Sequence, residues 1–160
     1  MQELKPPDRK RILCVDGYED NRVLLAYLLR ERGYCCVAVS SVTEALAAAH
    51  SEAFDLYILD NWYSDGTGIE LSRRIRRFDK SGPIIFFSAW PLETARQDAI
   101  RAGASAYLLK PALDEVLLFI RILLRNQTVS KDSRSMPEVT PPATSHSANP
   151  IQSPGGTQNL

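Results

Sequence analysis

Four polar residues each stand directly after a short apolar run, and together they supply the groups that chemistry on phosphorus requires. Two of them, Asp16 and Asp60, are carboxylates, and the others are the hydroxyl of Ser88 and the ammonium of Lys110. Carboxylates held close together repel each other and need a cation, and a hard ion such as Mg²⁺ prefers oxygen ligands. A carboxylate can also attack phosphorus and form an aspartyl phosphate. The hydroxyl and the ammonium would then stabilise the added negative charge.

The apolar runs that precede these residues have the length of strands buried on both faces of a parallel sheet. Five such runs are present, at residues 12–15, 34–39, 56–59, 84–87 and 106–109. They alternate with five segments of helical pattern, at residues 23–32, 43–50, 69–78, 92–102 and 113–124. Gly33 and Gly103 follow two of these segments, where a left-handed cap is needed. The alternation predicts a doubly wound α/β fold.

This fold determines where the four polar residues lie. The carboxyl ends of parallel strands share one edge of the sheet, and folds of this kind place their sites there. Any one of the four alone could be a helix cap or a surface group. Because all four stand at the same edge, we expect them to form one site.

Composition and charge narrow the class of protein. The chain has 160 residues, enough for one domain with a core, and a formal net charge of zero. Balanced charge does not favour a nucleic-acid or membrane partner. Three cysteines, two of them adjacent, indicate buried small side chains in a reducing compartment rather than disulfides. The polar first ten residues do not resemble a signal peptide, and the apolar stretch 116–124 is too short to cross a bilayer. These features predict a cytoplasmic protein.

The two ends of the chain differ from the rest. Residues 127–160 contain no Phe, Trp or Tyr and are rich in Ser, Thr and Pro. Such a segment cannot bury enough apolar surface to offset the entropy of ordering it. We therefore expect one domain at residues 9–126, between a disordered start at 1–8 and a disordered tail at 127–160.

Over about residues 9–126 the sequence resembles the response regulator receiver domains of bacterial two-component systems. The resemblance is carried by residues 15–22, 59–60, 65–68, 87–89 and, most specifically, 103–111. It implies a flavodoxin-like, five-stranded parallel sheet in the order 2-1-3-4-5 with helices on both faces. It also implies a signalling domain rather than an enzyme, one that catalyses only its own phosphorylation and dephosphorylation. The donor would be a sensor histidine kinase or a phosphotransfer protein, and the result a switched protein-interaction surface.

The same resemblance assigns roles to single residues. Asp60 would be the phosphoacceptor, Ser88 the hydroxyl that turns toward the phosphoryl group, and Lys110 the cation that pairs with a phosphoryl oxygen. The bond between Lys110 and Pro111 would be cis, a form largely confined to proline. Tyr107 matches an aromatic residue that swings inward on phosphorylation, with an ordinary strand aromatic as the alternative.

The metal site is where the sequence departs most from the family. Mg²⁺ would be bound by Asp16, Asp60 and the backbone carbonyl of Trp62. Receivers usually carry a second acid after the first strand, but here that position is Gly17. The loss of a carboxylate predicts weaker Mg²⁺ binding, because affinity for hard cations rises with ligand charge. The acids at positions 19 and 20 are expected to begin the first helix instead, where they favour its dipole.

Two loops carry further hypotheses. Ser64 replaces the proline common after the phosphoacceptor, which predicts a more mobile loop. Trp62 and Trp90 stand two residues after Asp60 and Ser88, at positions that in the family modulate loss of the phosphoryl group. The two indoles would exclude water from the phosphoryl group; the alternative is that they pack on their loops or meet a partner.

The last helical segment indicates an interaction surface. A helix that faces a core needs one apolar stripe, but residues 116–124 are apolar on more than one face. The excess predicts an exposed patch, and receivers commonly dimerise through the last two helices. Burial of the patch by the tail is the alternative. The arginines between positions 73 and 77 are expected to be solvated surface rather than a nucleic-acid patch.

Three other classes of protein share parts of this pattern. A pseudo-receiver that binds partners without regulated phosphorylation is the main alternative, and Gly17 motivates it. An aspartate-nucleophile phosphatase needs a second acid two residues after the nucleophile, where this chain has Trp62. A flavin site needs a first loop with free backbone amides, whereas the loop here carries three acids that would repel a phosphate.

Overall fold

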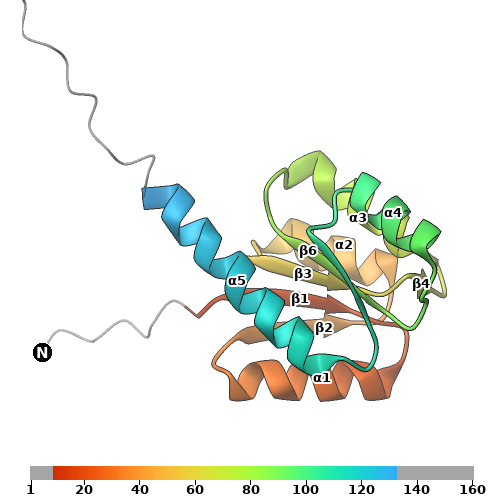
Figure 1. The fold of residues 1–160 in the computed structure, drawn as a ribbon, viewed down its shortest axis with the longest axis horizontal. Helices are drawn as coiled ribbons and strands as arrows, with labels where there is room; N and C mark the ends of the chain where they lie inside the picture. The colour runs from red at the N-terminus through yellow and green to blue at the C-terminus, as the bar shows by residue number, and fades with distance from the viewer. Residues whose placement is uncertain (1–8, 133–160) are drawn as a thin grey trace, which may run out of the picture.

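Five parallel strands form the main sheet in the computed structural model, which describes residues 9–132 (Figure 1). Their order across the sheet is β2-β1-β3-β6-β7. Because β4 and β5 lie in a separate ribbon, this is the predicted order 2-1-3-4-5, and the doubly wound fold is confirmed. The strands span β1 Arg11–Val15, β2 Cys35–Val39, β3 Leu56–Leu59, β6 Ile84–Ser88 and β7 Ala106–Leu109.

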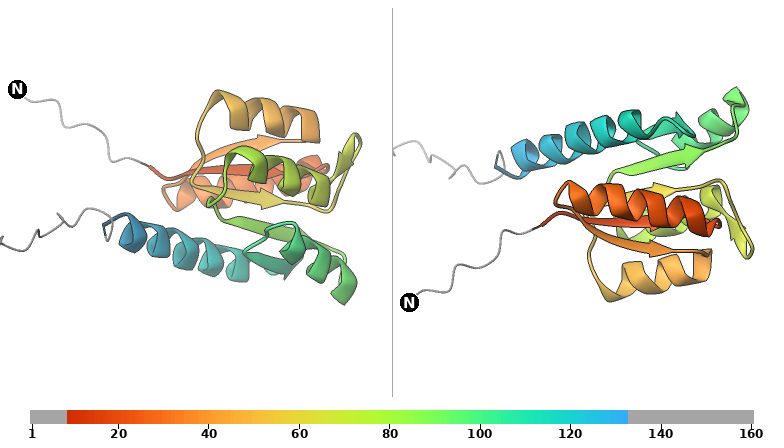
Figure 2. Two further views of the ribbon diagram at one scale, coloured as in Figure 1. Left: turned by 90° about the horizontal axis from the view of Figure 1, so that it is seen from above. Right: turned by 90° about the horizontal axis from the view of Figure 1, so that it is seen from below.

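Helices cover both faces of the sheet, which Figure 2 shows from above and below. One face carries α1 (Glu19–Glu31) and α5 (Leu113–Asp132), and the other carries α2 (Val42–Ser51), α3 (Gly68–Phe78) and α4 (Glu93–Arg101). Side chains alternate along a strand, so β1 directs Ile12 and Cys14 to the first face and Leu13 and Val15 to the second. The two resulting cores fix the strand ends that carry the polar residues.

Helix α5 is longer than the sequence predicted. We expected the helix to end at Leu124 and the tail to begin at residue 127, but the helix continues to Asp132 and projects beyond the sheet (Figure 1). The side-chain amide of Gln127 donates to the carbonyl of Asp55 at 3.2 Å, and extending a formed helix costs little free energy. The disorder predicted for residues 1–8 and 133–160 falls outside the described residues. Between residues 9 and 132 no helix is long and apolar enough to cross a membrane.

The loop after β3 forms a short antiparallel ribbon that the sequence did not predict. Its strands are β4 (Trp62–Tyr63) and β5 (Gly66–Thr67). At the tip, the Asp65 carboxylate accepts hydrogen bonds from the N–H groups of Thr43 and Val42, both at 2.9 Å. These bonds lower the pKa of Asp65 below its ordinary value, because they favour the charged form. The loop that we expected to be mobile is therefore fastened to the first turn of α2.

Two of the three cysteines are buried, as the sequence predicted. All are free, and Cys14 and Cys36 are buried on neighbouring strands with their sulfur atoms 3.4 Å apart. Cys35 is partly exposed, because alternation turns it to the opposite face of β2, which is an edge strand.

Gly68, the first residue of α3, stands where no side chain fits. A Cβ atom there would lie 2.1 Å from the Asp60 carbonyl oxygen and 2.8 Å from Phe86 Cε1. We expect Gly68→Ala to lower the free energy of unfolding by about 3 kcal/mol, because the backbone must shift. Gly17→Ala is the matched control, since its Cβ atom would meet only the Trp62 carbonyl oxygen, at 3.6 Å. Urea unfolding measures both variants, and equal losses of stability would contradict the expectation.

Candidate phosphoacceptor site

The carboxyl ends of β1, β3, β6 and β7 bring the four predicted residues to one edge of the sheet. The Lys110 ammonium lies between the two carboxylates, 2.6 Å from Asp16 Oδ2 and 3.0 Å from Asp60 Oδ2. Both carboxylates and Ser88 are buried. The sheet topology thus assembles the predicted set, and ion pairs join three of its members.

These ion pairs keep Lys110 charged. Burial disfavours the ammonium, but the hydrogen bonds to Asp16 and Asp60 and the charges of both carboxylates outweigh it. The pKa of Lys110 is therefore raised above its ordinary value. Two carboxylates share this single ammonium, so the cluster keeps an excess of negative charge that a further cation would neutralise.

Asp16 is held in place by the loop that follows it. Its Oδ1 accepts the N–H of Tyr18 at 2.9 Å and the side-chain amide of Asn21 at 3.3 Å. The Arg22 guanidinium donates to the Asp16 carbonyl at 2.8 Å. The acids at positions 19 and 20 lie in the first turn of α1, as predicted. The Asp16 carboxylate is thus oriented by two neutral donors on Oδ1, which leave Oδ2 for Lys110.

Ser88 and Lys110 are joined through the backbone. The Lys110 N–H donates to the Ser88 carbonyl at 2.9 Å, and the bond from Lys110 to Pro111 is cis, as the resemblance implied. The Ser88 hydroxyl accepts the N–H of Trp90 at 3.3 Å. In this arrangement the hydroxyl is engaged with its own loop rather than with Asp60.

The oxygen groups at this edge are of the kind that hard cations prefer. A Cβ atom added at Gly17 would lie 3.6 Å from the Trp62 carbonyl oxygen, so the position of the missing acid faces that carbonyl. Within the part of the chain that the structure describes, no group of three or more His, Cys, Asp or Glu side chains is placed to hold a metal. Two carboxylates and a carbonyl, with water, are a donor set that Mg²⁺ accepts.

Asn61 is a residue of the site that the sequence analysis missed. It is buried, and its N–H donates to Asp60 Oδ1 at 2.7 Å. Its side-chain amide donates to the hydroxyl of Tyr107 at 2.8 Å, and that hydroxyl donates to the Trp90 carbonyl at 2.7 Å. The sequence feature that could have identified Asn61 is its position, as a polar residue directly after Asp60. Nothing local could show that its partner lies 46 residues further along the chain.

The two tryptophans line a cavity that does not include the ion pair of Asp16 and Lys110. Trp62 is 62% exposed and Trp90 is 49% exposed. With Asn61 they line a cavity of about 200 Å³. Asp16 and Lys110 line a different cavity, of about 70 Å³, next to α1.

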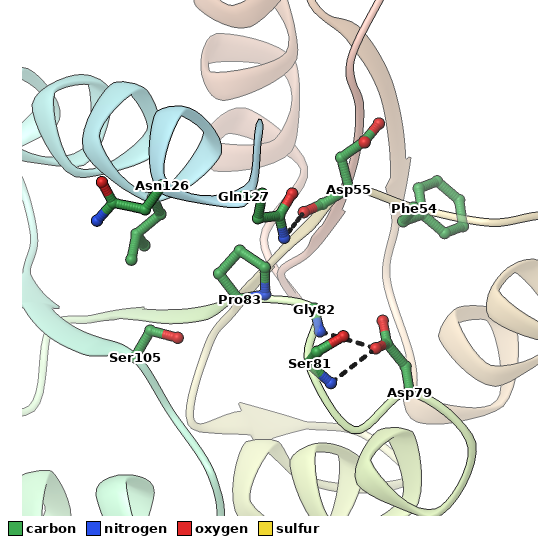
Figure 3. A pocket seen from close by; sticks show the side chains of 10 residues that line it. Phe54, Asp55, Asp79, Ser81, Gly82, Pro83, Ser105, Asn126 and Gln127 are labelled. Atoms are coloured by element: carbon green, nitrogen blue, oxygen red, sulfur yellow. Dashed lines mark hydrogen bonds between the residues drawn. The ribbon is translucent and has the colours of Figure 1, made fainter. Parts of the chain in front are cut away.

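A further cavity, of about 420 Å³, lies at the opposite, amino edge of the sheet (Figure 3). Several of its polar groups are already paired. Asp79 accepts the N–H groups of Ser81 at 3.1 Å and Gly82 at 2.7 Å, and Gln127 reaches the Asp55 carbonyl (Figure 3). These bonds shape the turn before β6 and attach α5 to the sheet, so a structural role accounts for them.

Comparison with known proteins agrees with this geometry. Residues 12–121 match the family model described as the response regulator receiver domain. The chain belongs to this family. A solved receiver domain from Methanospirillum hungatei JF-1 has a TM-score of 0.73 at 26% identity, covering 76% of this chain and 98% of that structure.

Longer proteins also contain a part similar to this receiver domain. The alkaline phosphatase synthesis transcriptional regulatory protein PhoP of Bacillus subtilis is 32% identical over 128 residues, which is 79% of this chain and 53% of PhoP. The sensor protein GacS of Pseudomonas syringae is 28% identical over 136 residues, which is 79% of this chain and 15% of GacS. This receiver domain therefore spans about half or less of either relative.

Proposed function

We propose that this receiver domain accepts a phosphoryl group on Asp60 and that the modification changes a protein-binding surface. The observation that carries the proposal is the buried cluster in which Lys110 contacts both Asp16 and Asp60. Burying charged groups costs free energy that their pairing only partly returns. Such a cluster is better accounted for by chemistry than by stability.

Asp60 Oδ2 is the proposed nucleophile. Oδ1 is occupied by the N–H of Asn61, whereas Oδ2 lies beside the Lys110 ammonium. A lone pair of Oδ2 forms the bond to phosphorus while the P–N bond of a phosphohistidine donor breaks, and the electron pair leaves with the imidazole nitrogen. Lys110 then pairs with one phosphoryl oxygen. The Ser88 hydroxyl turns away from the Trp90 N–H and donates to a second phosphoryl oxygen.

Three oxygen groups are the proposed magnesium ligands: the carboxylates of Asp16 and Asp60 and the backbone carbonyl of Trp62. When bound, Mg²⁺ supplies neutralisation of the charge that the phosphoryl group brings. Tyr107 is the proposed switch residue. Its ring lies beside Phe86, with ring centroids 6.1 Å apart, and its hydroxyl joins the loops after β3 and β6.

The proposed partners are a phosphoryl donor and a second copy of the chain. A sensor histidine kinase or phosphotransfer protein is the expected donor, and the similarity to the sensor protein GacS supports this class. Leu118 and Ile122 on α5 are exposed, as are Ile100 on α4 and Leu109 on β7, which supports a homodimer through the last two helices. Free cysteines suit the reducing cytoplasm.

Nucleic acid is not a proposed partner of this domain. Of the arginines on α3, Arg76 is engaged in the structure, since it donates to the carbonyls of Gly103 at 2.7 Å and Asp79 at 3.1 Å. Arg74 lies beside Glu70 at 3.7 Å. Two of the four arginines on α3 are thus engaged within the domain, which favours a solvated helix face over a phosphate-binding patch.

Intact-mass measurement after incubation with acetyl phosphate tests the function. We expect a phosphoryl adduct on the wild-type protein that needs Mg²⁺ and is absent from Asp60→Asn. The matched control is Asp55→Asn, because Asp55 lies at the amino edge of the sheet. An adduct that survives in Asp60→Asn would contradict the assignment of the acceptor.

Gly17 favours a second candidate, a pseudo-receiver that binds partners without regulated phosphorylation. With one carboxylate fewer, the site attracts Mg²⁺ less strongly than the usual receiver site. No adduct on the wild-type protein at high Mg²⁺, with acetyl phosphate and with phosphorylated histidine donors, would support this candidate over the first.

A further inference from the structure

We propose that Asn61 is a positioning residue that transmits the state of the Asp60 carboxylate to Tyr107 and Trp90. The inference rests on the proposed function of Asp60 as the phosphoacceptor. It concerns a residue with no part in the bonds that form or break at phosphorus.

Asn61 makes one hydrogen bond on each side of itself. Its backbone N–H donates to Asp60 Oδ1 at 2.7 Å, and its side-chain amide donates to the Tyr107 hydroxyl at 2.8 Å. A tyrosine hydroxyl has one proton to donate and can also accept. The Tyr107 hydroxyl uses both capacities, because it accepts from Asn61 and donates to the Trp90 carbonyl at 2.7 Å. The donors and acceptors are therefore ordered in one direction, from Asn61 to the loop after β6.

The first bond of this chain depends on the charge of Asp60. At present the Asn61 N–H donates to a carboxylate, and such charge-assisted hydrogen bonds are about twice as strong as neutral ones. When Oδ2 becomes the ester oxygen of an aspartyl phosphate, Oδ1 becomes the carbonyl oxygen of a neutral acyl group. The hydrogen bond from the Asn61 N–H to Oδ1 then weakens. Because this bond positions Asn61, the hydrogen bond from its side-chain amide to the Tyr107 hydroxyl weakens as well.

A second contact brings the same signal to Trp90 from the other side. The Trp90 N–H donates to the Ser88 hydroxyl at 3.3 Å, while the Trp90 carbonyl accepts from Tyr107. If Ser88 turns toward the phosphoryl group, the Trp90 N–H loses its partner at the moment when the path through Asn61 loosens. Both ends of the Trp90 residue would thus respond to phosphorylation of Asp60, the N–H through Ser88 and the carbonyl through Tyr107 and Asn61.

Fluorine NMR of protein labelled with 3-fluorotyrosine tests the inference. The Tyr107 resonance is assigned by its absence in Tyr107→Phe, and beryllofluoride with Mg²⁺ is the probe that imitates the phosphoryl group. We expect the probe to shift the Tyr107 resonance in the wild-type protein. In Asn61→Leu, which keeps the backbone N–H but loses the amide, we expect most of that shift to be lost, because the hydrogen bond that joins Asn61 to the Tyr107 hydroxyl is missing. Asn61→Leu must still reach saturation with beryllofluoride, which a general loss of structure would not allow, and the shift is compared at saturation.

Two further variants make the result decisive. Tyr27→Phe is the matched control for hydroxyl removal, because Tyr27 is 60% exposed on α1, and it should leave the Tyr107 shift intact. Asn61→Asp keeps the size of the side chain but replaces the donor by an acceptor. The Tyr107 hydroxyl must then turn from the Trp90 carbonyl, so its resonance should move even without the probe.

The outcomes separate the inference from the function on which it rests. A full wild-type shift of Tyr107 in Asn61→Leu, or an unmoved resonance in Asn61→Asp, overturns the inference and leaves Asp60 as the acceptor. If the wild-type protein binds no beryllofluoride and takes no phosphoryl group from acetyl phosphate, the proposed function fails and the inference falls with it.

Discussion

Lys110→Met is expected to slow phosphorylation of Asp60 by about 100-fold, the effect of removing one preorganised charge donor from a reacting centre. The same change should lower the free energy of unfolding by about 3 kcal/mol, because breaking a buried ion pair leaves uncompensated charge. The side chains involved are only 10–15% exposed, so water cannot replace the ammonium fully. Acetyl phosphate kinetics by intact mass and urea unfolding measure the two effects.

Two comparisons isolate the cause of that effect. Lys80→Met removes a lysine from the exposed loop before β6, and we expect it to leave both quantities close to wild type. Adding Asp16→Asn to Lys110→Met removes one of the two facing carboxylates, so it should restore part of the lost stability but none of the phosphorylation rate. If the effects of the two substitutions on the free energy of unfolding were strictly additive, Lys110 would not hold the carboxylates together.

The convergence of Asp16, Asp60 and Lys110 was predictable because it depends only on where strands end. A buried parallel strand is visible as an apolar run, and the residue after it must lie at the carboxyl edge. The position at this edge determines which residues lie close together, but the packing of the side chains determines which atoms are in contact. That the ammonium bridges both carboxylates, and that the Ser88 hydroxyl points to its own loop, follow from packing that no pattern in the sequence records.

The features that escaped prediction depend on partners distant in the chain. The β4–β5 ribbon consists of two-residue strands, too short to show a period of two, and it is fastened through Asp65 to a helix 22 residues earlier. The link from Asn61 to Tyr107 crosses from one strand end to another. The last turns of α5 have a polar sequence that is typical of a disordered tail. The hydrogen bond from Gln127 to the Asp55 carbonyl attaches them to the sheet.

Gly17→Asp is expected to raise the affinity for Mg²⁺ by about tenfold. The new side chain fits, because Gly17 is not among the glycines with positive φ and its Cβ atom would make an ordinary contact with the Trp62 carbonyl oxygen. A carboxylate there would stand beside the proposed ligands Asp16 and Trp62. Tenfold requires about 1.4 kcal/mol, well below the ~4 kcal/mol between unit charges 4 Å apart near a protein surface. Calorimetric titration with MgCl₂ at constant ionic strength measures it.

The same substitution should act in the opposite direction when Mg²⁺ is absent. Three carboxylates would then face the single ammonium of Lys110, so the free energy of unfolding should fall by about 1 kcal/mol, and added Mg²⁺ should more than restore it. Gly17→Asn is the matched control, since it adds a side chain of the same size without the charge. If both variants bind Mg²⁺ equally well, the gain comes from the shape of the loop rather than from the added carboxylate. Only a gain confined to Gly17→Asp would support a metal between β1 and the Trp62 carbonyl, and it would show that a carboxylate at position 17 strengthens Mg²⁺ binding.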